Sequence, residues 1–514
     1  MNYKKIIAIA SAAFLTLTTS CGDFDDINVN PNQPNDAYTS MMFTYSARYV
    51  RNFTMNSYEY DPWMQLRTGY LSEVKNNQFG SFTTTTTFGT GTYYTSVIKN
   101  MNTIIEMNED PETMNESYVT EFGSSENQIA TAKTLRAFFF MMLTDILGPI
   151  PYSEAFKGES DDIWEPKFDS QEEIYAALDE DLRDAYNRFD ESGSLSSADI
   201  LYNGNISRWK KFNATLRMMM AIKLADADPT NGQSRFAQAY NDGGITEVAD
   251  GFHYTFDSNS EAYAWMYYVG NMNYSGAGLG FAPNKVIVDA LKEYQDPRMF
   301  SYFTLDGYMG TVEGDPTDFN AYVGVPLGLA TNGEVTAAAQ GCCSVAASYC
   351  EPQATYGVIT AARSLLVQAE AAERGWINAD PKQLYEAGIR ASFDFQATYH
   401  TAVDGVDEYI ASEKVALSDN PQTAIEQIAT QRFLAGFMTC GVESWSDWRR
   451  FNIPTLPIYQ GHIDNGVEVY PYRLTYANTD IQYNERNATE AINTYLNGSD
   501  DMWQRVWWDV ADNL

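Results

Sequence analysis

The sequence predicts an all-α protein in which about four helical hairpins stack on one another, with long irregular segments between them. Three observations support this prediction. Apolar residues recur at spacings of three and four in about eight segments, the period of one buried helix face. Ser, Asp or Asn precedes several of these segments, where it would cap a helix. The stretches between them are polar, glycine-rich or aromatic and show no helical period.

The first two hairpins are expected over about 92–226. Their helices are predicted at about 92–107, at 127–147, from Ser170 onward and at about 206–226. Ser170 and Glu173 have the spacing of a capping box, in which each side chain bonds to the backbone of the other residue. The third helix should therefore begin directly after Ser170.

The last two hairpins are expected over about 358–450. Their helices are predicted at about 358–375, at 381–398, from Asn420 onward and at about 441–450. In two of them a capping residue is followed by proline, as Asp380-Pro381 and Asn420-Pro421. Proline suits the first helical position because the N–H that it lacks would have no partner there.

Two segments without a helical period, 55–91 and 228–357, are predicted to form the ligand-facing region. The first should be an extended loop or short strands, and the second is the longest irregular block. Long irregular segments in a compact protein usually carry function. The helical hairpins are interpreted as the scaffold for them.

Tyr, Trp and Asn in these segments are the candidate ligand-binding residues. Sugar rings stack on Tyr and Trp faces, and amide or charged side chains bind their hydroxyls. The same aromatic side chains could instead fasten the loops to the scaffold, and the sequence leaves both interpretations open. The candidates are Trp63, Arg67, Tyr70, Asn77, Trp265, Tyr267, Tyr268, Asn273 and Tyr274.

The N-terminus predicts export and a lipid anchor. Lys4 and Lys5 precede an apolar run over 6–17 that is too short to span a bilayer. Small residues then lead to Cys21, so residues 1–20 resemble a bacterial lipoprotein signal peptide, with Cys21 as the lipid-bearing (palmitate) residue. The acidic stretch 22–26 resembles the export tag of Bacteroidetes lipoproteins. Both resemblances imply an outer-membrane protein facing the cell exterior.

Composition restricts the partners and cofactors. The formal net charge is −35, and removing 1–20 takes away two lysines and no acid. Because a chain with this much negative charge repels nucleic acid, nucleic-acid binding is disfavoured. With Cys21 carrying lipid, a disulfide from Cys350 to Cys342 or Cys343 is the leading expectation. The three histidines do not stand at ligand spacing from these cysteines. No cofactor is expected; calcium on an acidic loop remains possible, although no EF-hand pattern supports it.

The sequence favours binding over catalysis. HExxH, P-loop, G-x-S-x-G and dinucleotide-binding patterns are all missing from it. Carboxylates are so abundant that a glycosidase pair could be drawn from many of them, so a surface glycoside hydrolase is the rival of another class.

Six ordered segments resemble the SusD/RagB family of outer-membrane lipoproteins. The clearest is LRAFFFMMLTDILGPIPYSEA at 135–155, an aromatic-rich helix followed by the family's turn. The others are NGNISRWKKFNATLRMMMAIKL at 203–224, SLLVQAEAAERGW at 364–376, IEQIATQRFLAGFMTCGVESWSDWRRFNIP at 425–454, PYRLTYANTDIQYNER at 471–486 and VWWD at 506–509. Local departures include Asn205 in place of Asp and Ala214-Thr215 in place of Asn-Ser.

This resemblance implies one SusD-like domain over 21–514 with four hairpins of tetratricopeptide type. It further implies a non-catalytic receptor that captures oligosaccharides and passes them to a SusC-like TonB-dependent transporter. An oligopeptide ligand is the alternative, and a lid without any ligand site of its own is a third interpretation. Among the motif residues, Trp445, Asp447, Arg449 and Arg450 are expected to form an ion-pair corner, and Trp507-Trp508 to dock the C-terminal tail.

Overall fold

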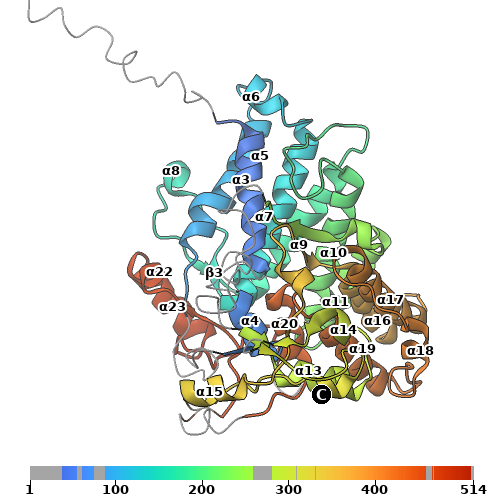
Figure 1. The fold of residues 1–514 in the computed structure, drawn as a ribbon. Helices are drawn as coiled ribbons and strands as arrows, with labels where there is room; N and C mark the ends of the chain where they lie inside the picture. The colour runs from blue at the N-terminus through green and yellow to red at the C-terminus, as the bar shows by residue number, and fades with distance from the viewer. Residues whose placement is uncertain are drawn as a thin grey trace, which may run out of the picture.

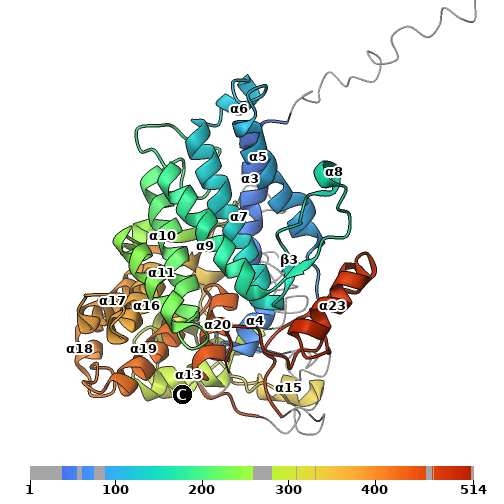
Figure 2. The same ribbon diagram turned by 180° about the vertical axis from the view of Figure 1, so that it is seen from behind.

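The computed structural model is mostly helical, which confirms the predicted all-α class. It describes residues 37–54, 61–74, 87–258, 281–307, 310–329, 331–458, 466 and 468–510. The eight predicted helices are all present (Figures 1 and 2). They are α5 Lys99–Glu109, α7 Ser125–Leu147, α9 Gln171–Arg188, α10 Ile206–Lys223, α16 Ala361–Glu373, α17 Pro381–Tyr399, α19 Pro421–Ala435 and α20 Gly441–Phe451.

The predicted helix starts are confirmed. Ser170 and Glu173 form a complete capping box at α9. The Asp380 side chain accepts hydrogen bonds from the backbone at the start of α17, and Asn420 does so at α19. Each helix begins directly after its cap because these oxygens satisfy N–H groups that have no partner inside the helix.

The helices pack in a continuous series. Helix α7 lies against α5 and α9, α9 against α10, α10 against α16, and α16 against both α17 and α19. One large apolar cluster runs through this series, from Phe43 to Trp508. Helix α7 is buried along nearly its whole length, since it has packed neighbours on opposite sides.

The two segments predicted to be irregular contain helices as well. They are α4 Asp61–Arg67, α11 Pro229–Asn241, α13 Lys285–Glu293, α14 Met299–Tyr302 and α15 Asn332–Ala338. Asp228 caps α11 and is followed by proline, while Thr331 and Glu334 form a capping box at α15. The expectation of an extended loop or short strands at 55–91, and of an irregular block at 228–357, was therefore wrong for these stretches. Their capping signals are local, and α13 also has the apolar spacing of a helix, with Ile287, Val288 and Leu291 buried.

Short strands fasten distant parts of the chain together. Strand β1 Leu71–Glu73 pairs with β6 Phe281–Pro283, and β5 Phe252–Thr255 pairs with β11 Thr355–Ile359, both antiparallel. Strand β2 Thr87–Phe88 pairs in parallel with β12 Thr475–Tyr476. The first of these pairs joins the two segments that were predicted to share the ligand-facing region.

The disulfide predicted from Cys350 to Cys342 or Cys343 is not formed. Cys342 and Cys343 are both buried thiols, and they belong to two different apolar clusters. The Cys342 thiol donates to the carbonyl oxygen of Ala338 over 2.9 Å. These cysteines pack as small apolar side chains, which buried thiols do readily.

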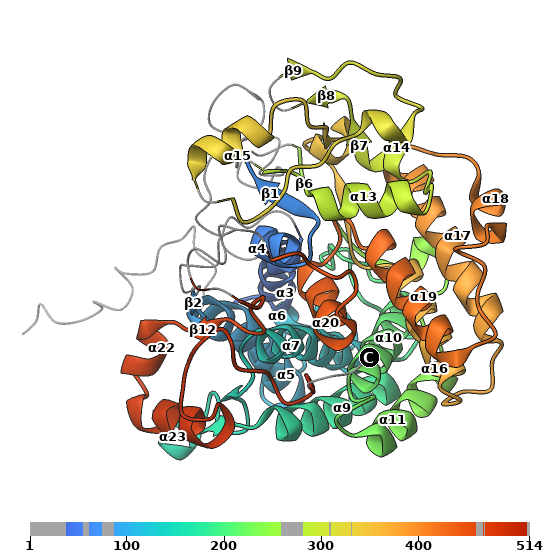
Figure 3. The same cartoon turned by 90° about the horizontal axis from the view of Figure 1, so that it is seen from below.

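Seen from below, the molecule has two distinct sides (Figure 3). Helices α22 Asn478–Gln482 and α23 Glu485–Tyr495 lie at one edge, and α16, α17 and α19 lie at the other. Helix α20 lies between them, close to α7. The two sides carry different chemistry.

Candidate ligand-binding cleft

Most residues predicted to bind ligand lie outside the described part of the chain. Trp63 lies in α4, but its side chain is not among those described. Residues wholly outside the described ranges are Asn77, Trp265, Tyr267, Tyr268, Asn273 and Tyr274. Their proposed role stays a prediction.

Arg67 and Tyr70 lie inside the protein. Tyr70 is fully buried, its ring stacks on Phe433 with centroids 4.9 Å apart, and its hydroxyl donates to the Phe433 carbonyl oxygen over 2.7 Å. Arg67 is 2% exposed, and burial lowers the pKa of its guanidinium to about 9. In this structure both side chains are buried, and Tyr70 packs against α19.

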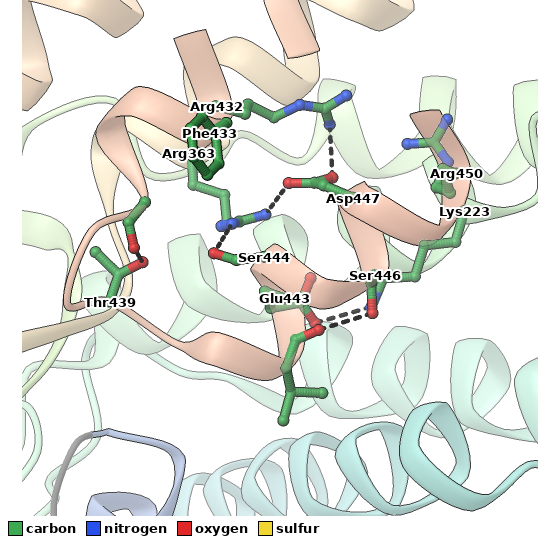
Figure 4. A network of polar contacts seen from close by, with 12 residues as sticks. Lys223, Arg363, Arg432, Phe433, Thr439, Glu443, Ser444, Ser446, Asp447 and Arg450 are labelled. Atoms are coloured by element: carbon green, nitrogen blue, oxygen red, sulfur yellow. Dashed lines mark hydrogen bonds and ion pairs between the residues drawn. The ribbon is translucent and has the colours of Figure 1, made fainter. Parts of the chain in front are cut away.

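The predicted ion-pair corner on α20 exists, with partners that the sequence did not identify (Figure 4). The Asp447 carboxylate binds Arg363 at 2.6 Å and Arg432 at 3.4 Å. Arg450 instead binds Glu370 on α16 at 2.6 Å. These groups join α16, α19 and α20 through charges that are almost fully buried.

Glu370 is the central anion of this buried network. It is 0% exposed and also pairs with Arg432 at 2.5 Å and with Arg374 at 2.8 Å. Burial alone would raise the pKa of Glu370, but the three surrounding arginines hold it well below its ordinary range. The carboxylate therefore stays charged and fixes all three guanidinium groups.

A second buried cluster docks the C-terminal tail, as predicted for Trp508. The Asp145 carboxylate accepts hydrogen bonds from Tyr175, from Lys223 at 2.6 Å and from the Trp508 indole at 2.8 Å. Lys223 also reaches Glu443 on α20 at 2.8 Å (Figure 4). Burial alone would lower the pKa of Lys223, but Asp145 and Glu443 raise it. These buried groups serve the scaffold.

Exposed aromatic side chains gather at the opposite edge, in a cleft of about 360 Å³. The cleft lies between the loop that joins β3 Ile150–Pro151 to β4 Phe168–Asp169 and the segment containing α22. Figure 1 labels β3 and α22. Trp164 is 70% exposed and Tyr483 is 80% exposed. We call this site the aromatic cleft. Its aromatic lining comprises Tyr94, Phe156, Trp164, Phe168, Tyr476 and Tyr483.

Local bonds fix Trp164 on its loop. The Trp164 indole N–H donates to the Asp162 carboxylate over 2.8 Å. Gly158 allows the ring to lie against the backbone, because a Cβ at this position would be 2.8 Å from the ring. At the base of the loop, antiparallel pairing of β3 with β4 holds the two ends together. The ring is therefore positioned although it is largely exposed.

Polar groups form the other wall of the cleft. The Asp480 carboxylate accepts hydrogen bonds from the backbone N–H of Thr90 at 3.1 Å and from its hydroxyl at 2.9 Å. The Asn484 amide donates to the carbonyl oxygen of Pro166 over 2.6 Å. Burial raises the pKa of Tyr94 well above its ordinary value, so its hydroxyl stays a donor, here to the Pro151 carbonyl.

Sequence reasoning missed this cleft because it searched only the two long irregular segments. The segments 135–155 and 471–486 were singled out as motifs, and Trp164 and Tyr483 lie just beyond or within them. A tryptophan followed two residues later by proline in a loop-like segment, IWEPKF at 163–168, was the available signal. The pairing of distant segments that forms the cleft was not visible in the sequence.

Comparisons with known proteins agree on one family. Residues 31–477 match the family model SusD-like_2, described as starch-binding associating with outer membrane. A SusD homolog from Bacteroides fragilis has 22% sequence identity and a TM-score of 0.77, covering 91% of this chain and 100% of its own. A chitin-binding SusD homolog from Flavobacterium johnsoniae has 23% identity and a TM-score of 0.72, covering 93% and 100%. No curated protein sequence matches significantly. At these identities the structural likenesses establish the fold.

Proposed function

Because this chain belongs to the SusD-like family, we propose that it is a cell-surface receptor that binds glycans for uptake and does not cleave them. The observation that supports this most directly is the aromatic cleft. It presents two largely exposed rings, Trp164 and Tyr483, beside amide and carboxylate groups.

The cleft has the chemistry that a neutral sugar requires. The C–H faces of a pyranose ring pack on indole and phenol faces, while its hydroxyls bond to polar groups at the rim, such as the Asp480 oxygen that Thr90 does not engage. Two of the structurally similar proteins are described as chitin-binding. We therefore propose neutral oligosaccharides as the ligand class.

The lining of the cleft favours binding over hydrolysis. Retaining and inverting glycosidases place two carboxyl groups on either side of the scissile bond. Among the described residues that line the cleft, Asp480 is the one carboxylate, and both hydrogen bonds from Thr90 already engage it. A glycan in this cleft would be held without a second acid to cleave it.

The remaining parts of the proposal concern location and delivery. Cys21 is proposed to carry the lipid that tethers the receptor to the outer membrane, on the outward face. Within the described ranges, no helix is long and apolar enough to cross a membrane. A SusC-like TonB-dependent transporter is the proposed recipient. The tether would hold captured ligand beside it and so raise the effective concentration without requiring high affinity.

Calorimetric titration of the mature protein with chitin and starch oligosaccharides tests the proposal. We expect Trp164→Ala to weaken binding about ten-fold, because stacking one ring is worth about 1 kcal/mol or more. Trp503→Ala is the matched control, since Trp503 is an exposed tryptophan (37%) outside the cleft. Unchanged binding in Trp164→Ala/Tyr483→Ala would exclude the cleft as the site. Release of shorter oligosaccharides would contradict the receptor role, and binding of peptides alone would change the ligand class.

A further inference from the structure

The aromatic cleft is short for an oligosaccharide. Its volume of about 360 Å³ lies near the lower end of the range for ligand pockets, about 300–1,000 Å³. A glycan with many sugar units must therefore continue over the surface beside the cleft. The path it takes depends on which neighbouring surface offers ring faces and hydroxyl groups.

One wall of the cleft belongs to the π-helix η2 Tyr93–Ile98, which also supports a second aromatic surface. Tyr94 lines the cleft and stacks on Phe156, with ring centroids 5.9 Å apart. The preceding residue, Tyr93, is buried and contacts the Tyr49 ring, with centroids 6.5 Å apart. Helix η2 therefore contributes to the cleft and supports Tyr49 at the same time. π-helices are rare and often lie at functional sites.

Tyr45 and Tyr49 form a pair of accessible rings. Tyr45 lies on α3 Thr39–Ala47, and Tyr49 follows one helical turn later. Their ring centroids are 5.5 Å apart with the planes tilted by 55°, and their hydroxyls form a hydrogen bond of 3.0 Å. Tyr45 is 44% exposed and Tyr49 is half-buried, while Met41 extends the exposed face one turn earlier. We call Tyr45 and Tyr49 the tyrosine platform.

The platform is held in place and keeps a hydrogen-bond donor. Tyr49 packs on Tyr93, whose hydroxyl in turn accepts from the Asn52 amide over 3.2 Å. Burial, together with the hydrogen bond to Tyr45, raises the pKa of Tyr49 to about 12, so this hydroxyl keeps its proton at neutral pH. A bond between two hydroxyls uses one proton, and the accepting hydroxyl can still donate to a ligand. Ring faces beside a donor are what a neutral sugar requires.

Hydroxyl groups also mark the path between the cleft and the platform. Thr95 lines the cleft and is exposed, and its hydroxyl lies 3.5 Å from that of Ser96. Helix α3 packs directly on this segment: the Ser46 hydroxyl accepts from the Asn100 amide over 3.2 Å and donates to the Val97 carbonyl oxygen over 3.4 Å. Helix η2 therefore joins the cleft to α3, with hydroxyl groups along it.

From this arrangement we propose that the tyrosine platform is a second contact site for long neutral glycans, whose chains extend from the aromatic cleft across η2 to Tyr45 and Tyr49. The inference rests on the proposed glycan-binding function and adds chain length to what the receptor recognises. Two contacts on one chain reinforce each other, because the second forms within a complex that already exists. The receptor should therefore prefer longer oligosaccharides.

Calorimetric titration of the mature protein with disaccharides and hexasaccharides of chitin and starch tests this inference. In the parent protein the hexasaccharide should bind at least about five-fold more tightly than the disaccharide. Tyr45→Ala removes the more exposed ring and should weaken hexasaccharide binding about five-fold, with disaccharide binding unchanged. Tyr495→Ala is the matched control, because Tyr495 is equally exposed (43%) and lies outside the cleft lining. It should change neither affinity.

The outcomes separate this inference from the proposed function. Thermal unfolding of each variant first establishes that it folds. If Trp164→Ala weakens binding of both lengths and Tyr45→Ala weakens neither, the platform is excluded while glycan binding stands. Equal losses for both lengths in Tyr45→Ala, or a length preference that Tyr495→Ala abolishes, would also overturn the inference. If the parent protein binds neither length, the proposed function itself fails.

Discussion

The buried ion-pair network around α20 and the aromatic cleft use their polar and aromatic groups in opposite ways. In the network, Glu370 is 0% exposed and its oxygens are shared among three arginines. In the cleft, Trp164 and Tyr483 are 70% and 80% exposed. In the network the charged groups bond to one another inside the protein. In the cleft the faces of the aromatic rings stay accessible to a ligand. Stability and recognition should therefore respond to different substitutions.

The largest effect on stability is expected for Glu370→Gln. This change leaves Arg450, Arg432 and Arg374 without their shared anion, and removing one partner of a buried ion pair costs about 3–5 kcal/mol. Urea denaturation would measure the loss. Glu293→Gln is the control, because the Glu293–Lys414 pair is exposed and such pairs contribute about 0–1 kcal/mol. Equal losses in both variants would contradict the importance of the network.

Acid should destabilise the scaffold next most strongly, through His253 and His400. Burial lowers the pKa of His253 to about 3 and of His400 to about 4. Both values lie below that of an unfolded histidine, about 6.5, so the unfolded chain binds more protons as the pH falls from 6.5 toward 4. Each histidine should then lower the free energy of unfolding by about 1.4 kcal/mol per pH unit.

Urea titrations at pH 7, 6 and 5 check this dependence. Phenylalanine at position 400 would keep a ring to stack on Tyr349, whose centroid is 3.7 Å from that of His400. His400→Phe should therefore flatten the pH dependence by the share of one histidine. An unchanged slope would show that His400 does not titrate as its burial predicts.

A smaller loss is expected for Trp508→Phe. The Trp508 indole donates to Asp145, and its ring lies 4.4 Å from the Arg449 guanidinium. Losing a hydrogen bond to a charged group costs about 1.5–3 kcal/mol. The variant should unfold earlier in a thermal melt and should be cleaved faster near its C-terminus by a protease. Equal cleavage of the variant and the parent would argue against tail docking.

The smallest stability change is expected in the cleft. Trp164→Ala should alter the free energy of unfolding by about 0.5 kcal/mol or less, because exposed side chains outside special features contribute little. The same variant should lose glycan binding. If Trp164→Ala unfolds as easily as Glu370→Gln, the division between scaffold and binding surface is not valid.

The sequence predicts the scaffold well because its signals are local. A capping box at Ser170 and proline after Asp380 fix helix starts without any knowledge of the rest of the fold. The apolar period likewise marks the buried face of each long helix. Trp508 docking and the charged corner on α20 were predicted from clustered aromatic and charged residues.

The ligand site and the partners in the ion pairs were not predictable from such local signals. Asp447 is close in sequence to Arg450, yet it binds Arg363 and Arg432, while Arg450 binds Glu370. Partner choice of this kind depends on how α16, α19 and α20 pack. Tyr70 has an aromatic side chain on which a sugar ring could stack, but it lies in the core. Aromatic side chains fill cores as readily as they line binding sites.

The loop that carries Trp164 begins and ends on the paired strands β3 and β4, and the contacts that fix Trp164, to Asp162 and across Gly158, lie within the loop itself. Its C-terminal end is also held from outside, because Asn484 and Asn487 donate to the carbonyl oxygens of Pro166 and Glu165. The part of the loop around Trp164 can therefore be exchanged without repacking the helices. Replacing this loop would give related receptors a different ligand specificity while keeping the same helical scaffold. Grafting loops of different length between β3 and β4 offers a direct route to redirecting the specificity of this protein.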